Sequence, residues 1–204
     1  MTRVVADITV SLDGFVTGPD AGPGNGLGTG GEPLHHWVFS DDPDDKRILA
    51  AATERSGAVV MGRNLFDVID APGGWSDEIG YGAAEVGKPS FLVVTSAAPP
   101  TLRLTGLDWT FVTTGLEDAV ASARSRAEAV SAARGADLDA ILMGGGALIG
   151  SALAAGLVDT LVLHLSPIIL GAGTPLFTGS GPRELVQREV VVTSTATHLT
   201  YDLG

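Results

Sequence analysis

Apolar residues along the chain gather in short runs that are separated by polar, glycine-rich or proline-rich segments. Residues 4–10 are rich in β-branched side chains and lead into a polar turn at residues 11–14, which predicts a strand that ends in a turn. Further apolar runs predict strands at residues 58–61, 91–95, 109–113, 140–143, 158–165 and 167–170. Residues 185–192 and 196–203 are predicted to close the chain as an antiparallel pair.

Two longer segments have helical character. Residues 44–55 form one of them, and residues 117–134 are rich in alanine with dispersed charges, as in a surface helix that buries one narrow apolar face. Residues 19–32 hold so much glycine and proline that we expect neither helix nor strand there. Because long loops in compact domains tend to be functional or mobile, we interpret this loop as a lid or an oligomer contact.

The alternation of strands with helices predicts an α/β fold, taken as one domain over residues 1–204. We expect a mostly parallel mixed sheet between two layers of helices, completed by the C-terminal antiparallel strands. Parallel strands end at the same edge of a sheet, so Gly62, Thr95 and Gly144, which close three strands, are expected to gather there. Open α/β sheets bind their ligands at this edge.

Composition narrows the possible partners. The chain has 204 residues, of which 45% are hydrophobic and 18% charged, enough to bury a sizeable core. A net charge of −12 without any basic cluster argues against nucleic acid. No apolar run reaches the roughly 18 residues that span a bilayer, and the N-terminus enters a strand pattern instead of a signal peptide, so we expect a cytoplasmic protein without a membrane partner.

Metal and thiol chemistry find no support in the sequence. The absence of cysteine excludes disulfides, thiolate ligands and thiol nucleophiles. The four histidines, at positions 35, 36, 164 and 198, lack the spacing of metal ligands. We therefore predict no metal site.

The glycine run Gly144-Gly145-Gly146 carries the strongest chemical signal. It follows an apolar strand and precedes a helical pattern, so its main chain can approach a phosphate closely while the positive end of the helix favours the anion. This pattern predicts a nucleotide cofactor. The dinucleotide fingerprint G-x-G-x-x-G is not met, since Ile149 stands at the third glycine, and no phosphate-binding loop of ATPases or GTPases is present. A tight turn without a ligand is the alternative.

Four segments occur in a characteristic order: residues 11–14 (Ser-Leu-Asp-Gly), 60–63 (Val-Met-Gly-Arg), 144–146 (Gly-Gly-Gly) and 165–177. Together they resemble the dihydrofolate reductase-like superfamily over almost the whole chain. More narrowly, the chain is similar to stand-alone relatives of the reductase domain of the bifunctional riboflavin-biosynthesis deaminase-reductase. The resemblance implies a three-layer α/β/α dihydrofolate reductase-like fold, NADPH as the cofactor and a homodimer.

The resemblance also implies which residues hold NADPH. Arg63 would bind a phosphate with its guanidinium, although it could instead pair with Asp67 on the surface. Thr95 and Ser96 would contact the adenosine ribose and its 2′-phosphate, or else form an ordinary turn. Leu65 supplies only its backbone N–H where dihydrofolate reductases commonly have threonine. The full set implied for the cofactor is Gly62, Arg63, Asn64, Leu65, Thr95, Ser96, Gly144, Gly145, Gly146, Ala147, Leu148 and Ile149.

Three residues are candidates for the chemistry on the substrate. Asp13 follows the first strand and could hydrogen-bond a polar substrate or relay a proton, or simply bond its own turn. His36 and Trp37 follow the glycine-rich loop and could bind the substrate, with the histidine as proton donor and the tryptophan as a stacking wall. A solvated loop histidine is the simpler interpretation of His36.

We therefore expect an NADPH-dependent oxidoreductase that reduces a small heterocyclic compound, pterin- or pyrimidine-like, or a carbonyl compound. Met143 stands where the riboflavin reductase has a glutamate against its pyrimidine, so the substrate stays open. Two alternatives remain. The chain could be a nucleotide-binding or regulatory protein without turnover, or a structural dimer module that binds no cofactor.

Overall fold

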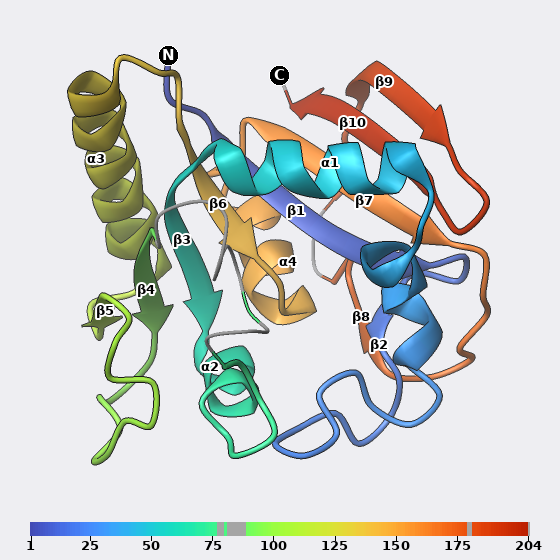
Figure 1. Cartoon of the computed structure of the whole chain (residues 1–204), viewed down its shortest axis with the longest axis horizontal. Helices are drawn as coiled ribbons and strands as arrows, with labels where there is room; N and C mark the ends of the chain where they lie inside the picture. The colour runs from blue at the N-terminus through green and yellow to red at the C-terminus, as the bar shows by residue number, and fades with distance from the viewer. Residues whose placement is uncertain (77–79, 81–88, 179–180, 204) are drawn as a thin grey trace.

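The computed structural model describes residues 1–76, 80, 89–178 and 181–203. Its central sheet contains β1 (Val4–Ser11), β3 (Ser56–Gly62), β4 (Ser90–Val94), β5 (Trp109–Val112), β6 (Asp139–Met143), β7 (Thr160–Ser166), β9 (Leu185–Val192) and β10 (Thr197–Leu203). The strand order is β5-β4-β3-β6-β1-β7-β10-β9 (Figure 1). The strands from β5 to β7 in this order are parallel, whereas β10 is antiparallel to both of its neighbours.

Helices cover both faces of the sheet, as Figure 1 shows for α1 and α4 on opposite sides. Helices α3 and α4 pack on one face, and α1, α2 and the 3₁₀ helix η1 lie on the other. A small second sheet joins β2 to β8 beside the start of α4. The bounds of these elements are η1 (Glu32–Phe39), α1 (Pro43–Glu54), α2 (Arg63–Ile69), α3 (Leu116–Arg134), α4 (Gly146–Ala154), β2 (Phe15–Thr17) and β8 (Thr174–Pro175).

Alternation along β1 divides the core between the two faces. Ala6, Ile8 and Val10 point into the apolar layer under α3 and α4, because successive side chains of a strand face opposite sides. The intervening residues, among them Asp7 and Thr9, therefore face the side of η1 and α1. One face of this central strand is thus apolar and the other largely polar.

Local signals fix the ends of two helices. Asp42 caps α1 by accepting a hydrogen bond from the N–H of Asp44 at 3.0 Å, and Pro43 occupies the first helical turn, where its missing N–H costs nothing. Helix α3 ends at Gly135, whose φ of 64° is the left-handed conformation that stops a helix. The observed bounds of both helices agree with the predicted ones to within one residue.

The structure confirms the mostly parallel sheet, the helices on both of its faces and the C-terminal antiparallel pair. The predicted strand at residues 167–170 is wrong, because this segment is irregular. Its main chain is instead held from the side, since Leu12 donates to the carbonyl of Ile168 at 2.8 Å and the carboxylate of Asp13 accepts from the N–H of Leu170 at 3.1 Å. The prediction also omitted α2, η1 and the short β2–β8 pair.

The glycine-rich loop at residues 19–32 contains no strand and reaches a helix only at its last residue, as expected. It closes on itself: Gly18 donates to the carbonyl of Leu27 at 2.8 Å, and Thr29 donates to that of Pro19 at 2.7 Å. Among the helices of the described residues, none has the length and hydropathy needed to cross a bilayer.

Candidate active site

The ends of β4, β3 and β6 meet at one edge of the sheet, as the sequence predicted. These strands are parallel neighbours, so Thr95, Gly62 and Gly144 follow them side by side. Helix α2 starts directly after β3, and α4 starts at Gly146, the last residue of the glycine run that follows β6. A Cβ placed on Gly144 would lie 3.4 Å from Cδ2 of Leu65, so the first turn of α2 touches the glycine run.

The three glycines have different structural roles. Gly144 has a φ of +54°, a conformation that favours glycine. Gly146 lies tightly against β8, since a Cβ there would be 2.7 Å from the carbonyl oxygen of Pro175. Gly145 is the open position, because a Cβ built on it would meet no atom within 4 Å. A ligand can therefore approach the main chain at Gly145, where two rigid neighbours hold it.

The start of α4 offers N–H groups at this open position. The N–H groups of Leu148 and Ile149 already donate to the carbonyl of Gly145 at 3.1 and 3.2 Å. Those of Gly145, Gly146 and Ala147 have no acceptor within the helix, and together with the helix dipole they would favour an anion at this position. The side chains of Leu148 and Ile149 are buried in the core, so only the main chain of this turn can serve a cofactor.

Arg63 and Thr95 are brought together across the edge. The Arg63 side chain is 35% exposed, and its Nη1 donates to the carbonyl of Ala97 at 3.0 Å and lies 3.5 Å from Oγ1 of Thr95. Its Nε also donates to Asp67 at 2.7 Å, so the surface ion pair considered as an alternative is present as well. These contacts hold the guanidinium at the sheet edge in a fixed orientation.

The remaining residues implied for the adenosine end are either exposed or hydrogen-bonded within their own turn. Asn64 and Ser96 are exposed. The hydroxyl of Thr95 donates to the carbonyl of Ala97 at 2.8 Å, which is the ordinary turn that the sequence also allowed. A phosphate group at this end would therefore be held mainly by Arg63.

Asp13 accepts hydrogen bonds that hold two neighbouring loops together. One carboxylate oxygen accepts from the Ser11 hydroxyl at 2.7 Å, and the other accepts from the N–H of Gly171 at 2.7 Å. The hydrogen bond from Ser11, followed by those from the main chain of Leu170 and Gly171, lowers the pKa of Asp13 to about 2. Asp13 is thus ionised near neutral pH, and it ties the turn after β1 to the loop after β7.

The two candidates on η1 differ from each other. His36 is exposed to solvent. Trp37 is 6% exposed, and its Nε1 donates to Oγ1 of Thr9 at 2.9 Å. Its ring lies 4.0 Å, centroid to centroid, from the ring of His164. The structure therefore places Trp37 in the interior, against the polar face of the sheet.

The sequence analysis missed a chain of four ionisable groups on this face, of which three are buried and one is partly exposed. Asp7 Oδ1 lies 2.9 Å from Nε2 of His164, and Nδ1 of His164 lies 2.7 Å from Nδ1 of His198. Nε2 of His198 lies 2.8 Å from Oδ1 of Asp45 on α1. We call these four residues the Asp–His chain. Two signals pointed to it, a charged residue within the apolar strand at residues 4–10 and a histidine within the apolar run at 158–165.

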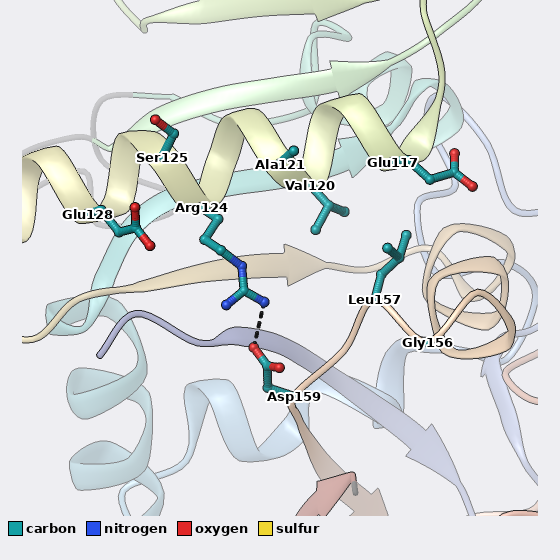
Figure 2. Close-up of a pocket in the computed structure, with 9 residues that line it drawn as sticks. All are labelled: Glu117, Val120, Ala121, Arg124, Ser125, Glu128, Gly156, Leu157 and Asp159. Carbon is teal, nitrogen blue, oxygen red and sulfur yellow. Dashed lines mark hydrogen bonds and ion pairs between the residues drawn. The ribbon is translucent and has the colours of Figure 1, made fainter.

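No group of three or more histidine, aspartate or glutamate side chains in the described part of the chain is arranged to hold a metal ion. Figure 2 shows a different hollow, a pocket of about 350 Å³ between α3 and the connection from α4 to β7. It lies at the opposite edge of the sheet, because its Asp159 precedes β7 and its Arg124 donates to the carbonyl of Thr2 ahead of β1. An ion pair between Arg124 and Asp159, at 2.8 Å, spans this hollow.

Solved structures with the same fold come from several reductase-like proteins. A protein from Shewanella sp. PV-4, assigned provisionally to riboflavin biosynthesis, is 22% identical with a TM-score of 0.68, covering 100% of this chain and 99% of that one. The deaminase/5-amino-6-(5-phosphoribosylamino)uracil reductase of Thermotoga maritima is 13% identical with a TM-score of 0.62, covering 100% of this chain and 57% of that one. Dihydrofolate reductase from Enterococcus faecalis, complexed with NADP(H), is 13% identical with a TM-score of 0.55, covering 99% and 96%. These likenesses confirm the dihydrofolate reductase-like fold.

Sequence comparison gives a more specific assignment. No curated protein sequence matches the chain. The sequence profile described as the RibD C-terminal domain matches residues 2–200, which is nearly the whole chain. The chain therefore belongs to the RibD C-terminal domain family.

Proposed function

We propose that the protein is an NADPH-dependent reductase of a small heterocyclic or carbonyl compound. Its family and its dihydrofolate reductase-like fold support an oxidoreductase of the reductase type. The single observation that carries the proposal is the open main chain at Gly145, next to free first-turn N–H groups and on the same sheet edge as Arg63. This arrangement fits a ligand with two separated phosphate groups.

The residues present fit NADPH in a definite order along the edge. The N–H groups of Gly145, Gly146 and Ala147 would bind the pyrophosphate. Arg63, beside Thr95, would bind the 2′-phosphate that distinguishes NADPH from NADH. In a chain with a net charge of −12, these local donors must supply the attraction for a polyanion. When bound, the reduced nicotinamide supplies a hydride to the substrate.

A binding titration tests the cofactor. We expect NADPH to bind the wild-type protein more tightly than NADH does, as measured by calorimetry. Arg63→Gln is expected to weaken NADPH binding by roughly 10- to 150-fold, because one charge-assisted hydrogen bond is worth roughly 1.5 to 3 kcal/mol, and to leave NADH binding nearly unchanged. Arg47→Gln is the matched control, since Arg47 is an exposed arginine of α1 paired with Asp44. Equal losses in both variants would contradict a role of Arg63.

Turnover distinguishes the reductase from its alternatives. Oxidation of NADPH in the presence of a panel of pterins, pyrimidines and carbonyl compounds is expected for the reductase. If NADPH binds but no compound of the panel oxidises it, a nucleotide-binding or regulatory protein is favoured. If NADPH does not bind, a structural dimer module is favoured. The homodimer implied by the resemblance stays a prediction, which light scattering of the purified protein measures.

A further inference from the structure

The Asp–His chain has one end open to solvent, and this end lies next to the glycine run. In the parallel pairing of β1 with β6, Asp7 is the partner of Met143, the residue directly before Gly144. The Asp7 side chain is 22% exposed, whereas His164, His198 and Asp45 are exposed by 1%, 5% and 0%. Protons can therefore enter or leave the chain at Asp7, level with the start of the candidate cofactor site.

The hydrogen bonds of the Asp–His chain need one proton more than two neutral histidines provide. A neutral imidazole carries one N–H and one acceptor nitrogen. With ionised carboxylates at both ends, each Nε2 must donate outward, which would leave two bare Nδ1 atoms facing each other at 2.7 Å. A hydrogen bond at this distance needs a third hydrogen. Three contacts thus hold three protons, and the four groups together carry one negative charge.

Asp45 lies at the closed end of the Asp–His chain, where it accepts several hydrogen bonds. Burial acts to raise the pKa of Asp45, but hydrogen bonds from Thr195, Ser40 and His198 outweigh it and lower the pKa. The hydroxyl of Thr195 lies 2.5 Å from Oδ2 of Asp45. These hydrogen bonds therefore favour the ionised form of Asp45 at the closed end.

Burial also lowers the pKa values of two histidines. Burial lowers the pKa of His198, as does the charge of His164, against an opposing contribution from Asp45. His35 of η1 also faces His164, and burial followed by that same charge lowers its pKa. Both shifts favour the neutral forms of His198 and His35. The partly exposed carboxyl group of Asp7 is the end of the Asp–His chain at which the third proton can exchange with solvent.

We propose that Asp7 is the catalytic proton donor and that His164, His198 and Asp45 are positioning residues that keep it supplied. This inference rests on the proposed reductase function. The same three protons can lie on Asp7, on Nδ1 of His164 and on Nε2 of His198, and in this arrangement Asp7 is a carboxylic acid that donates either to His164 or to a bound substrate. As the carbon of a substrate C=N or C=O bond gains a hydride, the π electron pair moves to the nitrogen or oxygen, and that atom takes the proton from the carboxyl group of Asp7. One hydride and one proton are added, and Asp7 is left as the carboxylate. Asp7 of the Asp–His chain regains a proton from water once the product has left.

The first test uses the protein without cofactor. In ¹⁵N-histidine-labelled protein at neutral pH, we expect the proton NMR spectrum to contain one strongly deshielded resonance. This proton lies between the Nδ1 atoms of His164 and His198 and should show scalar coupling to both nitrogens. Asp7→Asn and Asp45→Asn should each abolish or shift this resonance, whereas Asp202→Asn, which removes a β10 carboxylate outside the chain, should leave it in place. Two neutral histidines that titrate independently in the wild type would overturn the proposal.

The second test separates this proposal from the function on which it rests. With a substrate identified by the panel, Asp7→Asn is expected to lower kcat by about 100-fold or more, the usual contribution of a general acid, while its Kd for NADPH stays within about twofold of wild type. Asp7→Glu should restore part of kcat, and Asp45→Asn should shift the pH profile of kcat without abolishing turnover. A wild-type kcat in Asp7→Asn would overturn the role of Asp7. Failure of the wild type to bind NADPH would instead overturn the reductase function, and the resonance would still report on the chain.

Discussion

Two halves of the same sheet face are filled by opposite chemistries. Over β3, β4 and β5, under α2, the face is apolar and rich in aromatic rings, among them Phe66, Phe91 and Trp109. Over β1, β7 and β10, under α1 and η1, the same face holds the Asp–His chain. One half is held together by apolar packing, whereas the other is held together by hydrogen bonds between ionisable side chains.

The two halves should therefore respond differently to pH. Burial of apolar surface stabilises by about 25 cal/mol per Å² and edge-to-face ring pairs add roughly 0.5–1.5 kcal/mol, and neither contribution involves a titrating group. A buried hydrogen bond contributes only about 1 kcal/mol net, but removing one partner costs about 1–3 kcal/mol and depends on the charge of the other. Substitutions in the two halves can be compared on this basis.

The largest effect is expected in the apolar half. Phe66 is 1% exposed and meets Trp109 and Phe111 edge-on at 5.1 and 5.2 Å. Phe66→Ala should lower the free energy of unfolding by about 4 kcal/mol through lost burial and the cavity left behind, and by the same amount at pH 5.5 and pH 7.5. Urea unfolding at both pH values measures this, with Phe39→Ala as the control because Phe39 is 78% exposed. A pH-dependent loss would remove the distinction between the halves.

A smaller, pH-dependent loss is expected for Asp45→Asn. The folded pKa of Asp45 lies below the ordinary 3.8, so this carboxylate contributes stability above pH 3.8 that is lost as the pH falls through the folded pKa. The variant should lose about 2 kcal/mol at pH 7, because His198 and Thr195 lose a charged acceptor, and progressively less toward pH 3. Asp41→Asn, at a fully exposed position of the same segment, is the matched control. An unchanging loss from pH 7 to pH 3 would speak against this account.

The wild-type protein should lose stability as the pH falls below about 7. The folded pKa values of His198 and His35 lie below the ordinary 6.5, so the unfolded state takes up protons that these histidines resist in the fold. Each single proton contributes at most about 1.4 kcal/mol per pH unit.

Chemical denaturation from pH 5 to 8 measures this dependence. His198→Asn should reduce the loss of stability on acidification by the contribution of one proton. A wild-type stability that stays constant from pH 8 to pH 5 would contradict this account, while Phe66→Ala should keep the pH dependence and only lower the curve.

The smallest effect compares one tryptophan from each half. Trp37→Phe keeps a ring over His164 but loses the hydrogen bond to Thr9, and Trp109→Phe loses the hydrogen bond from its Nε1 to the carbonyl of Leu104 at 2.9 Å. Each should cost about 1 kcal/mol, measured by thermal unfolding. Only Trp37→Phe should move the imidazole resonances of His164. Shifts of equal size in both variants would mean that the two halves are not separate.

The sequence carried much of the fold because apolar runs and helix-capping residues act locally. The strand at residues 58–61 and the helix at 44–55 have such signals, and their observed bounds differ by one or two residues. The segment at 167–170 was misjudged because Asp13, far away in sequence, binds its main chain. Short elements such as η1 depend on tertiary packing and lack a periodic pattern of their own.

The candidate site also contains residues that local sequence signals predict and residues that only the tertiary structure brings together. The glycine run and Arg63 follow directly from strand ends, which the sequence places correctly. The Asp–His chain joins residues 7, 45, 164 and 198, and only the register that sets His198 opposite His164 between β10 and β7 brings them together. Trp37 follows a polar loop and so looked accessible, but η1 turns its ring inward over His164.

The contact of Gly146 with Pro175 has a consequence for ligand entry. Because α4 begins in direct contact with the β2–β8 ribbon, and Asp13 ties the neighbouring turns together, the amides proposed to bind phosphate are held in place without a ligand. A dinucleotide that binds as proposed would therefore meet a preformed socket and would lose little binding free energy to rearrangement of the protein. A bulkier residue at 146 would separate the ribbon from the helix and turn that socket into a loose flap.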